Sequence, residues 1–249
     1  MTLNMFGKLI INHKSLKNSN HLCSKMANLI LGIDDSGRGP VIGPMVLAGC
    51  LIDPKIETEL RKLGVRDSKQ LTPKRREFLE QIIKERATAF SVEVIFPEDI
   101  DNKGKSGINL NTVEAEMASK IINKINKGYG KIKVVIDCPS VNRTAWRDTV
   151  RTDIDNLTNL EILCEHKADR NHISVSAASI IAKQERERQM SLLKKKYGDS
   201  IGSGYASDPN TTKFLSEKGQ KYKDSGIFRK SWKTWQDAEA KAKQTKLKF

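Results

Sequence analysis

Two adjacent acids at the end of an apolar run, Asp34 and Asp35, constrain the fold of this chain more than any other feature. The run begins at Leu29, breaks after the acids into Ser-Gly-Arg-Gly-Pro, and is followed by a second apolar run that reaches Leu51. Short apolar runs on either side of a glycine-rich break are typical of neighbouring strands in one sheet. We therefore expect both acids on the first strand, where successive side chains point to opposite faces.

This pair of acids has two interpretations. An ionised carboxylate on a buried strand is costly unless a cation neutralises it, which indicates a metal site. Alternatively, Asp34 and Asp35 simply end a strand and begin a turn, and the pair alone leaves both interpretations open. Gly37, Arg38 and Gly39 then combine backbone that can approach a ligand closely with a side chain that can meet a phosphate. The acids and this loop together suggest a metal site beside a nucleic-acid backbone.

The charge of the chain indicates an anionic partner. Lysine and arginine outnumber aspartate and glutamate by 44 to 30, which gives a formal net charge of +14, and the excess is spread along the sequence. Nucleic acid is the leading partner for such a surface, although a basic surface that only keeps a protein in solution has the same composition. We expect no membrane span, because the longest apolar run, Val41 to Ile52, is interrupted by glycine and proline.

The cysteines and the central histidines lack the spacing of metal ligands. Cys50, Cys138 and Cys164 lie in apolar runs, where free cysteine behaves as a small apolar residue. We therefore expect a reducing, cytoplasmic compartment and no zinc. His166 and His172 are expected at the surface or in hydrogen bonds.

Residues 1–28 contain four lysines and no acid, and they are rich in asparagine and serine. This composition resists packing into a core, so we expect a basic, disordered extension. Met26 stands shortly before the first strand and is an alternative start to Met1.

Two further strands run into acids. Residues 131–137 form an apolar run that ends in Asp137, and residues 160–164 form another that leads towards Asp169. Acids at the ends of separate buried strands weigh against a simple turn. Thr72 and Pro73 predict the start of a helix, whose apolar face would be Phe78, Leu79, Ile82 and Ile83. The pattern also predicts a polar link over residues 60–69, a strand over 91–96 and a loop over 97–111. Further helices are predicted over 112–125, 175–188 and 213–222, and a basic, broken tail from Leu192. Aromatic residues interleaved with lysines in that tail either contact nucleic acid or anchor an appended helix.

Several stretches together resemble the type 2 ribonuclease H family, and their pattern is closest to its archaeal members. They are GIDDSGRGPVIGPMV, RDSKQLTP, LNTVEAE, VVIDCPSVN, EHKADRNHISVSAASIIAK, YGDSIGSGYASDPNT and RKSWKT, and they follow the family's order from Leu29 to Thr234. The resemblance implies an α/β, RNase H-like fold with a mixed β-sheet flanked by helices and a C-terminal helical subdomain. We expect a catalytic domain over residues 29–205, followed by the helical subdomain and basic tail over residues 206–249.

The resemblance also implies the site. Four carboxylates would hold two divalent ions, Mg²⁺ or Mn²⁺, and they correspond to Asp34, Asp35, Asp137 and Asp169. All-oxygen ligation suits these ions, and two of them can activate a water and stabilise a leaving oxygen in phosphodiester hydrolysis. The resemblance further implies contacts with nucleic acid. The loop Gly37, Arg38 and Gly39 would read the 2′-hydroxyl, and Tyr205 would lie at the RNA to DNA junction. The remaining implied contacts are Lys69 and Lys167.

Two departures from the family's pattern matter. The family normally has Glu where this chain has Asp35, and it has Arg-Asp where this chain has Arg186-Glu187. The expected function is a metal-dependent endoribonuclease that cuts the RNA strand of RNA/DNA hybrids and single ribonucleotides embedded in duplex DNA. The alternative is a non-catalytic basic nucleic-acid-binding protein on the same fold, with a site impaired by Asp35.

The last six residues, Gln244–Phe249, faintly resemble the peptide with which some archaeal relatives bind the sliding clamp. Its usual paired aromatics are reduced to a single Phe249, so a disordered, lysine-rich tail is the other interpretation. We expect a monomer.

Overall fold

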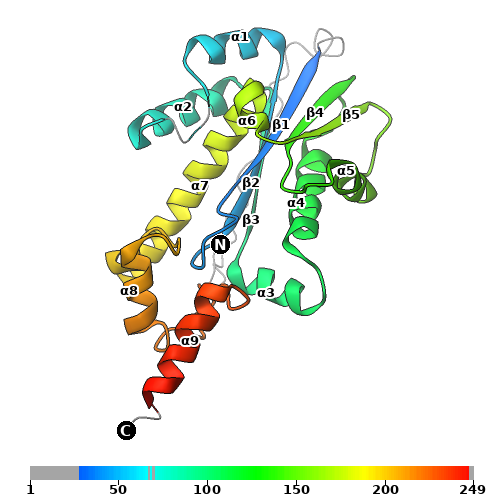
Figure 1. Ribbon diagram of the computed structural model, residues 1–249. Coiled ribbons are helices and arrows are strands. Elements are labelled where there is room, and N and C mark those ends of the chain that lie inside the picture. Colours follow the sequence, from blue (N-terminus) through cyan, green and yellow to red (C-terminus); the bar gives the residue numbers. More distant parts are fainter. Residues whose placement is uncertain (1–27, 67, 69–70, 247–249) are drawn as a thin grey trace, which may run out of the picture.

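The computed structural model describes residues 28–66, 68 and 71–246, and over this range five strands are interspersed with helices, with only helices after the last strand (Figure 1). Four expectations concern residues that the structure does not describe: the basic extension, the start at Met1 or Met26, Lys69, and the last three residues of the chain. The elements are β1 (Leu29–Ser36), β2 (Met45–Ile52), α1 (Pro54–Lys62), α2 (Pro73–Arg86), β3 (Ala89–Ile95), α3 (Pro97–Lys105), α4 (Leu110–Ile125), β4 (Ile132–Asp137), α5 (Arg143–Thr152), β5 (Leu160–Glu165), α6 (Ala168–Asn171), α7 (Ile173–Tyr197), η3 (Asp199–Ile201), α8 (Pro209–Lys218) and α9 (Lys233–Lys246).

The strands form one mixed sheet in the order β3-β2-β1-β4-β5. β1 is central, since it pairs antiparallel with β2 and parallel with β4. Ile33 lies opposite Ile136 in the parallel pair, so the next residues, Asp34 and Asp137, are neighbours at the same edge of the sheet. This register confirms that the predicted acids end adjacent buried strands.

Helices cover both faces of the sheet, with α4 and α5 on one face and α2 and α7 on the other (Figure 1). The alternation of side chains along each strand divides the core accordingly. The α4 face buries Leu31, Ile33 and Leu47 against Val113, Ile121 and Trp146. The α7 face buries Val46, Ala48 and Cys50 against Leu79, Ile83, Ala177 and Ala178. The small residues of α7 let that helix approach β1 closely, as the sequence predicts.

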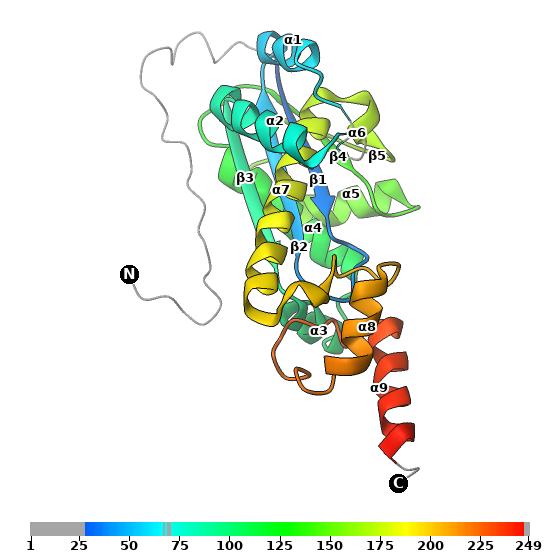
Figure 2. The same ribbon diagram turned by 90° about the vertical axis from the view of Figure 1, so that its left-hand side faces the viewer.

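A third apolar cluster forms the C-terminal subdomain, which Figure 2 shows at the lower end of the molecule, with α9 extending furthest. It joins α8 and α9 to the end of α7 through buried side chains that include Ile42, Met190, Phe214, Phe228 and Trp235. The rings of Phe228 and Trp235 lie 4.4 Å apart, so these aromatics anchor the appended helices. This cluster includes residues from both sides of position 205, so it does not mark a boundary there. The predicted division between a catalytic domain and a C-terminal subdomain at residue 205 stays a prediction.

The structure corrects several predicted elements. The predicted polar link over residues 60–69 begins inside α1, which Asp53 caps by accepting the N–H of Ile56 at 2.8 Å. The predicted loop over residues 97–111 contains α3 and the start of α4. The predicted tail from Leu192 begins inside α7, and Gln244–Lys246 end α9 instead of being disordered.

One predicted core side chain is also wrong. Thr72 and Pro73 open α2 as predicted, and Leu79 and Ile83 are buried, but Phe78 is 47% exposed. Its ring lies under the guanidinium of Arg75 at 5.0 Å, so it packs against a neighbouring cation at the surface. Within the described chain, no helix combines the length and the apolar character that a bilayer crossing needs.

Candidate active site

The four predicted acids line one pocket at the carboxyl ends of β1 and β4. The pocket has a volume of about 310 Å³, and its walls also include the Gly37–Gly39 loop and Tyr205. Four cationic residues line the same pocket: Arg38 of that loop, Lys167, Arg170 and Lys183. The structure therefore brings together all the predicted site residues that it describes.

Asp34 and Asp35 leave β1 towards opposite helix layers, as expected for successive strand residues. Asp34 is 6% exposed and accepts hydrogen bonds from the N–H of Asp35 at 2.8 Å and from Ser179 of α7. Asp35 instead interacts electrostatically with Glu114 of α4. Burial raises the pKa of Asp34 well above its usual value, and the negative charges of Asp35 and Asp137 raise it further.

Asp137 is fixed by the turn that delivers the fourth acid. Its Oδ1 accepts the N–H of Ala168, the first residue of α6, at 2.9 Å. Lys167 precedes this helix with φ 58°, a left-handed conformation that costs a residue with a Cβ roughly 1–2 kcal/mol. This strained turn points Asp169 into the pocket, and strain of this kind is concentrated at functional sites.

The donors of the pocket fit hard divalent cations. All four acids offer oxygen ligands, and their crowding raises the pKa of Asp34, which a bound cation would counteract. Among the residues that the structure describes, no three acidic, imidazole or thiol groups already stand close enough to hold a single ion. The acids around the pocket therefore have the donor type and the charge that such a cation needs. They do not form a closed set of ligands among the described residues.

The side chain of Arg38 is bonded within the protein. It donates to Glu114 and to Asn111, both on α4, and it still lines the pocket, so a contact of its guanidinium with a phosphate stays a prediction. Glu114 is 2% exposed, and its pKa is raised to about 8, chiefly by burial and also by the charge of Asp35, against the lowering effect of Arg38. Sequence reasoning missed Glu114, although a lone glutamate on the apolar face of the predicted helix was a usable signal.

Tyr205 covers the Gly-Arg-Gly loop. The residue is 37% exposed, and a Cβ placed on Gly39 would lie 3.9 Å from Cε1 of its ring. The guanidinium of Arg186 stacks 5.0 Å from the ring centre and donates to the carbonyl of Ser203 at 3.0 Å. Arg186 also lies behind the loop, since a Cβ on Gly37 would meet its side chain at 2.4 Å. Sequence reasoning noted Arg186 only as part of a departure and missed its contact with Tyr205.

The histidines have the hydrogen-bonded roles predicted for them. His166 Nδ1 lies 3.0 Å from the carbonyl oxygen of Cys138, and His172 Nε2 lies 2.9 Å from Glu165. Cys50 is free and buried, and burial raises its pKa to about 12, so it behaves as a small apolar residue.

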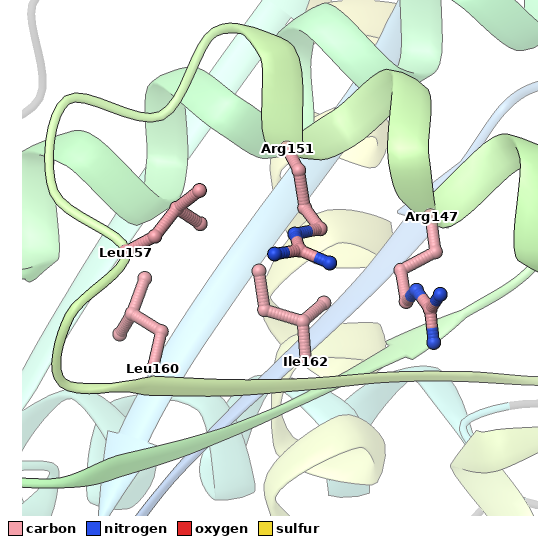
Figure 3. Close-up of a pocket in the computed structure, with 5 residues that line it drawn as sticks. All are labelled: Arg147, Arg151, Leu157, Leu160 and Ile162. Carbon is pink, nitrogen blue, oxygen red and sulfur yellow. The ribbon is translucent and has the colours of Figure 1, made fainter.

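A second pocket lies at the edge strand β5, away from the acids. Figure 3 shows Arg147 and Arg151 of α5 beside the apolar side chains of Leu157, Leu160 and Ile162. Its volume is about 130 Å³, and none of its lining residues is an acid. It adds positive charge to the sheet edge but offers no ligand for a catalytic metal.

Comparison with known proteins agrees with this geometry. The family model described as ribonuclease HII matches residues 31–235. Ribonuclease HII of Methanocaldococcus jannaschii is 42% identical over 229 residues, which are 88% of this chain and 98% of that protein.

Two solved structures share the fold. The ribonuclease H2 of Pyrococcus horikoshii superposes with a TM-score of 0.77 at 36% identity and covers 86% of this chain and 98% of its own. The ribonuclease HII in the PCNA complex of Archaeoglobus fulgidus has a TM-score of 0.72 at 38% identity, with coverage of 82% and 95%. The family match over most of the chain, together with these identities, shows that the chain belongs to the ribonuclease HII family, whose members are endonucleases.

Proposed function

We propose that this protein hydrolyses the RNA strand of RNA/DNA hybrids and cuts duplex DNA at embedded ribonucleotides, by means of two divalent ions. The observation that carries the proposal is the meeting of four acids from β1, β4 and α6 with the Gly37–Gly39 loop and Tyr205 around one pocket. In a cell this activity would remove RNA primers and misincorporated ribonucleotides during replication and repair.

The four acids are the proposed ligands of Mg²⁺ or Mn²⁺. When bound, such ions supply an activated water and stabilise the leaving oxygen, which gives 3′-hydroxyl and 5′-phosphate products. The chain contributes the orientation of its ligands. The N–H of Ala168 holds Asp137, while the N–H of Asp35 and the hydroxyl of Ser179 hold Asp34. Hydrogen bonds of this kind to ligating groups keep the oxygens aimed into the pocket.

The neighbouring residues are the proposed substrate contacts. Backbone atoms of the Gly37–Gly39 loop would sense the 2′-hydroxyl, and the exposed ring of Tyr205 would stack on the sugar beside the cut. Lys167 lines the pocket and would meet a phosphate, a role that we also propose for Lys69. The positive charge of the whole chain favours such a polyanion.

A second partner is proposed for the C-terminus. The Archaeoglobus fulgidus relative was solved as a complex with PCNA. We propose that the chain binds a sliding clamp weakly through Gln244–Phe249. We also propose that the enzyme is a monomer and is cytoplasmic. Calorimetry with the intact chain and a chain lacking these six residues tests it, and no heat of binding from the intact chain rejects it.

The assay that tests the proposed function uses a DNA duplex with one ribonucleotide beside a full RNA/DNA hybrid, each with Mg²⁺, Mn²⁺ or EDTA. We expect cutting with the metals and none with EDTA. Binding without cutting under every condition would instead support the non-catalytic alternative, which depends on the shorter reach of Asp35.

A further inference from the structure

Arg229 is a fully buried cation whose partners are main-chain carbonyls. It lies between α8 and α9, and its guanidinium donates to the carbonyls of Gly37 at 2.6 Å, Arg38 at 2.7 Å and Gly43 at 3.0 Å. Its own N–H donates to the carbonyl of Val41 at 2.9 Å. A residue of the C-terminal segment thus holds the Gly-Arg-Gly loop.

The charge of Arg229 is expensive to keep in this place. The pKa of Arg229 is lowered to about 9, chiefly by burial and also by repulsion from Arg186. No acid forms an ion pair with it within the described part of the chain. Three carbonyls in different directions require the planar fork of arginine, because the single ammonium of lysine cannot reach all of them. The side chain is therefore matched to the shape of the loop.

The segment that carries Arg229 is itself held on both sides. Asp101 of α3 accepts the N–H of Lys230 at 2.6 Å and the N–H of Ser231 at 3.1 Å. On the other side, the N–H of Gly43 donates to the carbonyl of Ile227 at 3.0 Å. Arg229 consequently acts from a rigid support.

Holding a carbonyl also fixes the N–H of the same peptide group. In a planar trans peptide the C=O and the N–H point in opposite directions. The carbonyls of Gly37 and Arg38 point to Arg229, so the N–H groups of Arg38 and Gly39 point away from it. In the described chain, neither of these two N–H groups has a protein acceptor. The loop lines the pocket of the four acids, whereas Arg229 is not among the residues that line it.

We propose that Arg229 is a positioning residue, which aims the N–H groups of Arg38 and Gly39 as a fixed pair of donors at an oxygen of the ribonucleotide to be cut. The proposal deepens the proposed function and rests on it. The acceptor is either the 2′-hydroxyl oxygen or the adjoining phosphate oxygen, and both suit a pair of successive backbone donors.

Binding measured in EDTA tests this role without catalysis. Fluorescence anisotropy compares a DNA duplex with one ribonucleotide and the all-deoxy duplex, for the parent and for Arg229→Lys. The variant keeps a nitrogen donor but loses the fork, so we expect its affinity for the ribonucleotide duplex to fall about 5- to 10-fold, the effect of roughly one hydrogen bond. A 2′-hydroxyl acceptor predicts that only the ribonucleotide duplex is affected, whereas a phosphate acceptor predicts equal losses for both duplexes.

Phe214→Leu is the matched control, because Phe214 is buried in the same C-terminal cluster and is not among the residues that line the pocket. Both variants are compared at equal distance below their own melting temperatures. Unchanged binding by Arg229→Lys, or the same loss in Phe214→Leu, overturns the proposal.

A measurement on the parent protein covers the case in which Arg229→Lys does not fold. The amide NMR signals of Arg38 and Gly39 should shift when the ribonucleotide duplex is added in EDTA, and unmoved signals overturn the proposal. Failure of the parent to cut any ribonucleotide substrate with metals would refute the proposed function instead, and these binding measurements do not depend on cutting.

Discussion

Gly32→Ala tests whether α7 lies directly against β1, the contact that positions the acids. Gly32 precedes Asp34 by two residues on β1. A Cβ built on it would lie 2.1 Å from the carbonyl carbon of Ser174 and 2.2 Å from the backbone nitrogen of Val175. Ordinary contacts between such atoms are about 3.5 Å, so α7 would have to retreat by more than about 1 Å.

The cost should be near the upper end of the range for an overpacked core. Such substitutions cost about 1–3 kcal/mol, and here both obstructing atoms are backbone that cannot rotate away. We expect a loss of about 3 kcal/mol in the free energy of unfolding, which corresponds to a fall of roughly 6–12 °C in melting temperature for a domain of this size. Retreat of α7 also moves Ser179 from Asp34, so cleavage should fall further than the unfolded fraction explains.

Gly104→Ala in α3 is the matched control, since a Cβ there would meet no atom within 4 Å. In a helix this change should be neutral or stabilise by up to about 1 kcal/mol. Urea and thermal unfolding followed by circular dichroism measure both variants. A Gly32→Ala protein within about 0.5 kcal/mol of the parent would refute the close packing of α7 on β1.

Three further predictions concern the site. Asp34→Asn should stabilise the protein in EDTA at pH 8. The pKa of Asp34 is higher in the folded protein than its ordinary 3.8, so the parent loses stability as the pH rises from 3.8 through the raised pKa, whereas the asparagine variant does not. Melting curves should therefore show a stabilisation by the variant at pH 8 that vanishes near pH 4. We expect the parent to cleave better with Mn²⁺ than with Mg²⁺, because the carboxylate of Asp35 falls short of the usual ligand position by roughly 1.5 Å. Asp35→Glu should reduce this difference by improving cleavage with Mg²⁺, and lower Mg²⁺-supported cleavage by the variant would contradict the argument. Tyr205→Ala should lose at least about 10-fold in kcat/KM on the single-ribonucleotide duplex, beyond any change in melting temperature, whereas equal activity would leave Tyr205 as a loop-packing residue.

The sequence predicted the sheet and the acids because both depend on local patterns. Apolar runs that end in Asp34 and Asp137 identified β1 and β4, and the Thr72-Pro73 pair identified the start of α2. The family resemblance then selected the site residues, and Asp169 is among those that the structure places in the pocket.

Elements that depend on tertiary packing were missed. α3 begins at Pro97, and its N-cap residue, Phe96, makes no side-chain cap. The helix contains Gly104 and buries little apolar surface beyond Ile100, so its apolar pattern is too weak to separate it from a loop, although Pro97 and the first-turn acids are helix-start signals. Arg229 stands in a basic, aromatic stretch typical of a surface, and its carbonyl partners lie almost two hundred residues earlier in the chain. A buried arginine bonded to distant backbone leaves no pattern in its own neighbourhood. Glu114 was predictable in part, as an acid among apolar residues on a helix.

The most direct test of the central claim is cleavage by Asp137→Asn. Asp137 ends a buried strand beside Asp34, and its amide replacement keeps the acceptor that Ala168 needs while removing the charge that binds a cation. Cleavage of the single-ribonucleotide duplex is measured at saturating Mg²⁺ and Mn²⁺, with melting temperature and duplex binding in EDTA as controls. We predict no detectable cleavage by a folded protein that binds the duplex like the parent. Near-parental turnover with either metal would contradict a metal site built on these four acids.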